Sequence, residues 1–224
     1  MTGRTLAIGD VHGCDLALRT LIGLIAPTQS DTVVLLGDLV DRGPDTADVI
    51  EQVLRLQSRC RVILILGNHE EMMLQALDGQ GWFMWMQCGG DEALESYGGD
   101  PTAIPERHRD LLESALDYWE TPDTIFVHAN LEHGIALSDQ HAVCLRWTHL
   151  SGTERPFDPA RRVICGHTPQ SNGLPLIMPG WVCIDTDCQR GGWLTCLDVC
   201  SNVVYQASQS GETRSFPLGY PERS

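Results

Sequence analysis

The chain has 224 residues, of which 42% are hydrophobic and 20% charged, as in an ordinary globular protein with a sizeable core. Its formal net charge of −15 argues against non-specific binding to nucleic acid or anionic membranes, and no apolar run is long enough to span a bilayer. All fifteen basic residues are arginine, which excludes Schiff-base chemistry through lysine and a phosphate loop ending in Gly-Lys.

The first third of the chain repeats strand, loop and helix three times. We expect strands at 4–8, 32–36 and 61–66, each followed by a helix, at 15–25, 45–57 and 69–77. Alternation of this kind is typical of parallel strands joined by right-handed crossovers.

Residues 79–120 differ in character, because aromatic segments with helical spacing, "GWFMWMQ" and "RHRDLLESALDYWE", are separated by glycine and proline. We interpret this region as a helical insertion, either a cap over a site or ordinary helices covering one sheet face. Strands follow, and we expect them at 124–128, 161–167, 181–185, 193–199 and 202–207.

The pattern as a whole predicts an α/β (α+β) fold, with a two-sheet β-sandwich flanked by helices. We expect a single domain over residues 1–208 that contains the insertion, and a loosely ordered polar tail over 209–224. The N-terminus has no signal-peptide pattern, so we expect a cytoplasmic protein. Nine cysteines without a C-x-x-C pair are expected to be mostly buried, reduced thiols.

Polar residues follow the ends of five predicted strands. The first three ends read "GDVHG", "GDLVDRG" and "GNHE", with 23 residues in each gap between them. Because ligands of open α/β sheets lie at the carboxyl ends of the strands, we expect these loops to converge. They would bring together three histidines, two carboxylates and one amide: Asp10, His12, Asp38, Asn68, His128 and His167.

This donor set contains nitrogen and oxygen but no thiolate, which suits manganese, iron or zinc. Six side chains are more than one ion with open positions uses, so they indicate two ions bridged by one carboxylate. Two such ions can hold both the attacking and the leaving oxygen of an in-line phosphoryl displacement. Gly9, Gly37 and Gly67 each precede a proposed ligand and would allow the backbone to approach the ions closely.

At these residues the sequence resembles the calcineurin-like metallophosphoesterase superfamily, whose blocks read GD-x-H-G, GD-x-x-D-R-G and GNHE. The complete "GDLVDRG" and "GNHE" are similar to the phosphoprotein phosphatase family, and "GDVHGC" to its short bacterial and phage-type members. The resemblance runs from Ile8 to about Thr186 and is weakest across the insertion. It implies two divalent metal ions, with manganese expected and iron, zinc, nickel or magnesium as alternatives.

The resemblance also divides the metal ligands between the two ions. Asp38 would bridge them, and the others would fall into two groups, Asp10 and His12 on the first ion, and Asn68, His128 and His167 on the second.

The same resemblance implies that His69 is the general acid, that Asp41 orients it, and that Arg42 clamps the phosphate. A second phosphate-binding arginine is expected between the last two histidines. We choose Arg146 for this role, because the alternatives at 161 and 162 adjoin the start of a strand far from its tip.

The function that follows is a serine/threonine protein phosphatase acting on phosphorylated proteins or peptides. Direct attack by a metal-bridging hydroxide would release phosphate while His69 protonates the leaving alkoxide. The alternative is a symmetrical dinucleoside (diadenosine) tetraphosphate hydrolase, or an enzyme for other small phosphoesters or nucleotides, with Trp82 or Trp85 contacting the nucleotide. A non-catalytic phospho-binding module is a third reading, which would need no general acid. No nucleic-acid or membrane partner is expected.

Overall fold

The computed structural model describes residues 3–219, and its first sheet has seven strands. The strand order is β12-β11-β10-β1-β2-β3, with β9 paired to β10. Its strands are β1 (Thr5–Ile8), β2 (Thr32–Leu35), β3 (Arg61–Leu64), β9 (Asp185–Thr186), β10 (Trp193–Asp198), β11 (Val203–Ala207) and β12 (Thr213–Pro217). Strands β1, β2 and β3 are parallel, as predicted, and their connections contain helices α1 (Asp15–Ile25) and α2 (Thr46–Gln57).

The second sheet has five strands in the order β4-β5-β6-β8-β7. These are β4 (Tyr118–Glu120), β5 (Thr124–Val127), β6 (Arg162–Cys165), β7 (Leu176–Met178) and β8 (Trp181–Cys183). Strands β5, β6 and β8 are parallel, whereas β4 and β7 run antiparallel at the two edges. Helix α7 (Ala142–Trp147) packs Leu145 against this sheet, and a short 3₁₀ helix, Leu137–Asp139, precedes it.

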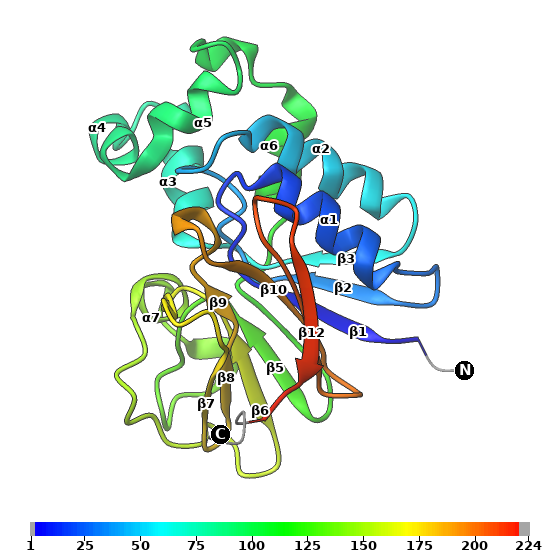
Figure 1. Cartoon of the computed structure of the whole chain (residues 1–224). Coiled ribbons are helices and arrows are strands. Elements are labelled where there is room, and N and C mark those ends of the chain that lie inside the picture. Colours follow the sequence, from blue (N-terminus) through cyan, green and yellow to red (C-terminus); the bar gives the residue numbers. More distant parts are fainter. Residues whose placement is uncertain (1–2, 220–224) are drawn as a thin grey trace.

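The two sheets lie face to face, with α1 and α2 on the outer side of the first sheet (Figure 1). Alternation along the strands produces this layering. In β1, Leu6 and Ile8 pack with the helices, whereas Ala7 faces the second sheet. Both faces of the central strands are therefore buried, which explains why they read as continuous apolar runs. The predicted two-sheet sandwich flanked by helices is confirmed.

The region 79–120 is mostly helical but is more broken than predicted. Helix α3 (Asn68–Leu77) leads into α4 (Trp82–Trp85), the π-helical turn η1 (Met86–Gly90), α5 (Asp91–Glu95), the 3₁₀ helix η2 (Pro101–Ala103) and α6 (Glu106–Glu113). The helix expected over residues 107–120 stops at Glu113, because residues 118–120 form edge strand β4, where Trp119 stacks on Phe126. Among the described residues 3–219, no helix has the length and apolarity needed to cross a bilayer.

The expectation of a loosely ordered tail after residue 208 is wrong for residues 213–217. These residues form β12, which pairs with β11 along its whole length. Phe216 packs against the core between the sheets, and the Arg214 guanidinium lies 4.3 Å from the centroid of the Trp193 ring. Alternating side chains thus tie this polar segment to the sheet edge. Residues 220–224, also placed in that tail, lie outside the described residues.

Candidate functional site

The predicted strand-end residues meet at one cavity of about 430 Å³. Five of the six predicted metal ligands line it, and the sixth, His128, lies fully buried directly behind them. The lining residues are Asp10, His12, Asp38, Arg42, Asn68, His69, Cys88, Trp147, His149, His167, Pro169, Asp185 and Arg190. Side chains from both sheets and from the loops after β1, β2 and β3 are thus brought to one place.

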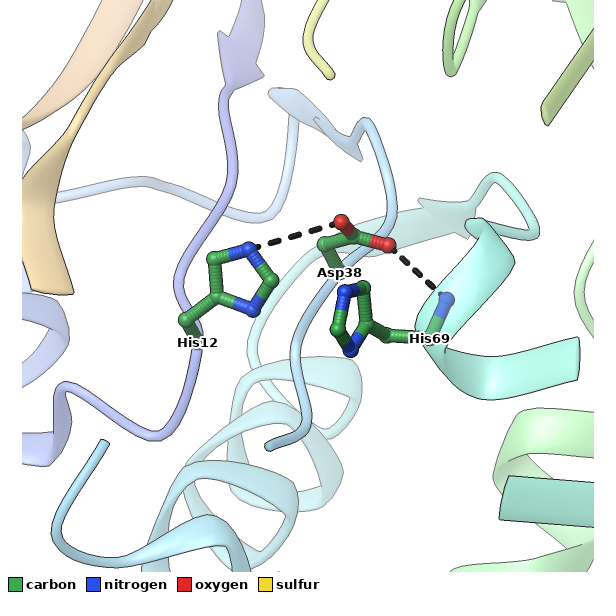
Figure 2. A group of neighbouring side chains, drawn as sticks. All are labelled: His12, Asp38 and His69. Carbon is green, nitrogen blue, oxygen red and sulfur yellow. Dashed lines mark hydrogen bonds and ion pairs between the residues drawn. The ribbon is translucent and has the colours of Figure 1, made fainter. Parts of the chain in front are cut away.

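The Asp38 carboxylate lies between imidazoles from two distant segments (Figure 2 shows the His12 side). Its Oδ2 is 3.4 Å from Nε2 of His12, and its Oδ1 is 3.4 Å from Nε2 of His128. Nδ1 of His12 donates to the Val40 carbonyl at 3.0 Å, and Nδ1 of His128 donates to the Leu36 carbonyl at 2.8 Å. These backbone bonds fix the tautomers, so each Nε2 presents a lone pair, as metal-ligating histidines usually do.

A second convergence of electron-pair donors surrounds His128. Its Nε2 lies 3.1 Å from Oδ1 of Asn68 and 3.1 Å from Nδ1 of His167. Together with Asp38, these atoms give one side of the cavity a nitrogen- and oxygen-rich pocket. Asp38, His128 and His167 have ligand atoms close enough to share one cation, and so do His12, Asp38 and His69.

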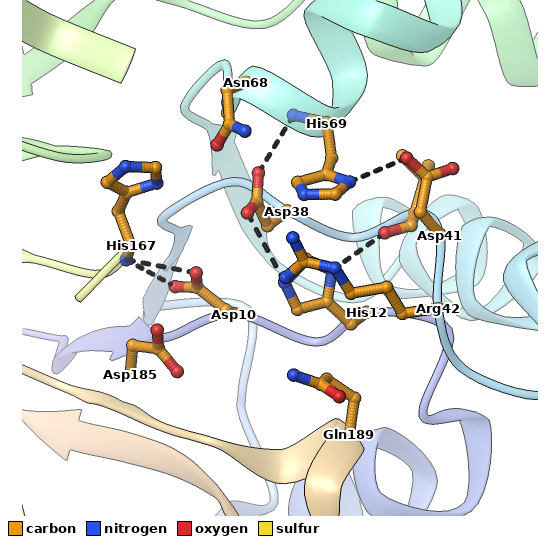
Figure 3. Close-up of polar contacts among 12 residues, drawn as sticks. Asp10, His12, Asp38, Asp41, Arg42, Asn68, His69, His167, Asp185 and Gln189 are labelled. Atoms are coloured by element: carbon orange, nitrogen blue, oxygen red, sulfur yellow. Dashed lines mark hydrogen bonds and ion pairs between the residues drawn. The ribbon is translucent and has the colours of Figure 1, made fainter. Parts of the chain in front are cut away.

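Buried negative charge accumulates beside these groups (Figure 3). Burial, together with the charges of Asp185 and Asp38, raises the pKa of Asp10 well above its usual value. Burial likewise raises the pKa of Asp185 to about 7. Cations in the cavity would relieve the repulsion among these carboxylates and restore their charged forms.

Burial has the opposite effect on the pKa values of two histidines. Burial lowers the pKa of His12 to about 3 and that of His167 to about 3, so both imidazoles are neutral near pH 7. Neutral imidazole and ionised carboxylate are the forms that bind metal. The donor set, its lone pairs and its protonation therefore fit divalent metal ions.

The backbone at the site is held in an uncommon conformation. Eight non-glycine residues among 3–219 have positive φ, and five of them belong to the site: His12, Asp38, Asp41, Arg42 and His167. Such residues persist only where their surroundings fix them. Gly67 is needed for a close approach, because a Cβ there would lie 2.2 Å from Oδ1 of Asp38. The same carboxylate oxygen accepts the backbone N–H of His69 at 3.2 Å.

His69 and Asp41 form a buried pair beside the proposed ligands. Nδ1 of His69 donates to Oδ2 of Asp41 at 2.7 Å, and the two side chains are 1% and 0% exposed. Burial alone lowers the pKa of His69, but the charge of Asp38 and the bond to Asp41 outweigh it, so the pKa is raised. The raised pKa favours the protonated form of His69, which is the form that a general acid requires.

Positive charge reaches the cavity from Arg42 and Arg190. Arg42 lines the wall as predicted, with Nη1 at 2.9 Å from Nε2 of His12. Arg190, in the 3₁₀ helix η4 (Cys188–Arg190), also lines the cavity, and within residues 3–219 its guanidinium makes a single, long ion pair of 3.8 Å, with Asp187. No motif in the sequence singles out Arg190.

Arg146, chosen from the sequence as the second phosphate-binding residue, is not placed at the cavity by the structure. Its Nη1 donates to Glu71 at 2.6 Å, its Nη2 is bound by Asp117, and it does not line the cavity. Two residues from the same segment do line it, namely Trp147 and His149.

The structure also shows where three further residues lie. His149, which has no motif around it, stacks on the His167 ring with centroids 4.4 Å apart. Trp85 is fully buried and cannot stack on a nucleotide base, whereas Trp82 is 40% exposed. Asp187 occupies a left-handed position with φ of 61°, a conformation that aspartate tolerates, and its side chain does not line the cavity.

Comparison with known proteins gives one family for these features. The family model described as calcineurin-like phosphoesterase matches residues 3–171. Serine/threonine-protein phosphatase 2 of Escherichia coli is 26% identical over 183 residues, which cover 80% of this chain and 79% of that protein. Symmetrical bis(5′-nucleosyl)-tetraphosphatase of Paracidovorax citrulli is 45% identical over 73 residues, 32% of this chain and 25% of that protein.

Two further findings show how much of each protein these similarities cover. The chain spans about a quarter of the length of the tetraphosphatases it matches. A protein serine/threonine phosphatase from Saccharomyces cerevisiae has the same fold, with a TM-score of 0.65 and 17% identity, covering 99% of this chain and 82% of that one.

Proposed function

The chain belongs to the calcineurin-like phosphoesterase family, and from this premise we propose that it is a metal-dependent serine/threonine protein phosphatase. The observation that carries the proposal is the convergence, at one cavity, of a divalent-metal donor set with Arg42 and the His69–Asp41 pair. A binding module would have no use for a buried, charged proton donor beside its metal ligands. The non-catalytic reading is therefore disfavoured.

The site would hold two divalent metal ions, with Asp38 as a ligand that both halves of the donor set share. Manganese is the expected metal, because the donors are imidazole, carboxylate and amide, and iron, zinc, nickel and magnesium remain alternatives. When bound, the ions would supply an activated water and positive charge against the phosphate. Asp10 and His12 would serve the first ion, and three residues from the other side of the cavity the second: Asn68, His128 and His167.

The protein's own residues orient the ester and move one proton. Arg42 presents its guanidinium fork to the phosphate oxygens. Nε2 of His69 gives its proton to the leaving oxygen as the phosphorus–oxygen bond breaks, and Asp41 stabilises the imidazolium beforehand.

This proton donor favours the phosphatase over the alternative. A serine or threonine alkoxide is a strong base that cannot leave without a proton, whereas a nucleotide leaves as a weakly basic phosphate anion. A buried His69 with a raised pKa is therefore most useful for an alkyl phosphate ester. The long alignment with the Escherichia coli phosphatase supports the same assignment.

One observation keeps the symmetrical dinucleoside tetraphosphatase as a second candidate. Trp147 lies on the cavity wall and is 36% exposed, so its ring could stack on a nucleobase. Arg42 and Arg190 would then contact successive phosphates of the polyphosphate chain.

The test is a comparison of kcat/KM for a phosphoserine peptide, para-nitrophenyl phosphate and diadenosine tetraphosphate, with enzyme loaded with manganese. We expect the phosphopeptide to have the higher kcat/KM of the two biological substrates. A higher value for diadenosine tetraphosphate would select the second candidate. Absence of turnover with manganese, iron, zinc, nickel and magnesium would reject the enzyme assignment altogether.

Arg190→Gln is expected to raise KM for the phosphopeptide roughly three- to tenfold, the effect of losing one exposed charged contact of about 1 kcal/mol. We expect kcat to change little, because Arg190 would contribute a charged contact to substrate binding, whereas the proton for the leaving group comes from His69. Steady-state kinetics measure both constants. Arg146→Gln is the matched control and should leave KM unchanged, since Arg146 is bound by Glu71 and Asp117. The reverse pattern would restore Arg146 to the phosphate site.

A further inference from the structure

The second oxygen of the Asp41 carboxylate has a partner from the helical insertion. Nε1 of Trp85 donates to Oδ1 of Asp41 at 2.8 Å, while Oδ2 holds Nδ1 of His69 at 2.7 Å. We infer that Trp85 is a positioning residue for the proton donor, and that the insertion thereby controls proton transfer to the leaving group. This inference rests on the proposed function of the same site.

The three side chains form a chain of hydrogen bonds that is buried away from solvent. Trp85 is 0% exposed, Asp41 0% and His69 1%. A buried indole N–H without an acceptor would be costly, so Trp85 and Asp41 each satisfy the other. With both oxygens bound from different elements, the carboxylate is not free to rotate about its own bond. The His69 ring is then held in one orientation, with Nδ1 bound to Asp41 and Nε2 left as the nitrogen that can face a substrate.

The backbone of the same turn is held by the next residues of the insertion. Asp41 and Arg42 have φ values of 71° and 68°, which few non-glycine residues adopt. The N–H of Arg42 donates to the Gly89 carbonyl at 3.1 Å. Gly89 itself has φ of 105°, and a Cβ there would lie 2.7 Å from the Arg42 nitrogen. Residues 85–89 therefore clamp the turn that carries both Asp41 and Arg42.

The position of Trp85 separates its effect from phosphate binding. Trp85 does not line the cavity, so its loss should not remove a contact with substrate. It should instead let Asp41 and His69 sample orientations in which proton transfer is slower. A leaving group that departs without a proton should be indifferent to that change.

Trp85→Phe keeps an aromatic ring but removes the N–H donor. We expect kcat for a phosphoserine peptide to fall at least about tenfold, a share of the 10²–10⁴ that general acid catalysis supplies. For para-nitrophenyl phosphate, whose phenolate leaves unaided, we expect kcat to fall less than about twofold, with KM unchanged for both substrates. Trp82→Phe is the matched control. Trp82 packs edge-on against Trp85, but the indole N–H that bonds to the His69–Asp41 pair belongs to Trp85.

Equal losses for both substrates, or no loss for the phosphopeptide, would overturn the inference while leaving the proposed function intact. If Trp85→Phe does not fold, replacement of Trp85 by β-(3-benzothienyl)alanine provides the same comparison, because sulfur replaces N–H within the same ring shape. In wild-type protein, NMR should find the Trp85 indole proton protected from exchange. Rapid exchange would refute the hydrogen bond, and this readout remains valid even if no phosphate ester is a substrate.

Discussion

Asp38→Asn is expected to lower kcat by roughly 10³-fold or more, because a metal centre supplies several kcal/mol of charge stabilisation and each 1.36 kcal/mol is worth about tenfold. The two oxygens of Asp38 face Nε2 of His12 and Nε2 of His128, each at 3.4 Å. One residue thus serves both halves of the donor set. An amide keeps the shape but provides a single, uncharged oxygen. Steady-state kinetics and metal analysis of the same preparation measure the change.

The control for this substitution is Asp187→Asn. Asp187 is also acidic and near the cavity, but its side chain does not line it, and asparagine tolerates its left-handed backbone. We expect Asp187→Asn to keep both its metal and its activity. Asp38→Asn with near-normal rates and two bound ions would remove Asp38 from the position between the metals.

The parts of the site that the sequence could predict are those tied to regular structure. Asp10, Asp38 and Asn68 each follow the end of a parallel strand, and parallel strands place their carboxyl ends at one edge of the sheet. The glycine before each of them is required by close approach of other chain segments. A regular pattern therefore fixed both the residue types and their meeting point.

The parts that escaped prediction depend on irregular loops. Arg190 and His149 line the cavity from the short segments that follow β9 and α7, and no local spacing in the sequence indicates that these segments meet there. Arg146 looked suitable from its place in the chain, yet Glu71 and Asp117, both distant in sequence, bind its guanidinium. Side chains on loops are placed by tertiary contacts, which a single sequence does not display.

The insertion illustrates the same limit for an aromatic residue. Helical spacing correctly indicated helices near Trp85 but could not tell a packed indole from an exposed one. In the structure Trp85 is buried, and its indole N–H donates a hydrogen bond to Asp41. Residue 118 onward looked helical as well, yet pairing with β5 makes it a strand, since a neighbouring edge outweighs weak local propensity.

His69→Asn is expected to lower kcat for a phosphoserine peptide by roughly 10²- to 10⁴-fold, the usual contribution of a general acid. The reason is that asparagine cannot carry the proton that Asp41 and Asp38 stabilise on His69. For para-nitrophenyl phosphate the loss should be much smaller, because its leaving group needs no proton. Kinetics with both substrates measure the difference, and His141→Asn, at an exposed histidine paired with Glu132, is the control.

Metal analysis of the same variant separates two roles for this histidine. His69 has a nitrogen near enough to His12 and Asp38 to share a cation with them, so geometry alone permits a ligand role. Its Nδ1 donates to Asp41, so Nε2 would either bind a metal as a neutral imidazole or carry the proton of a general acid, and these two roles exclude each other. Retention of both ions in His69→Asn, with loss confined to the alkyl ester, identifies a proton donor. Loss of an ion, together with an equal fall in kcat for both esters, would identify His69 as a metal ligand. The proton of the leaving group would then have to come from another residue.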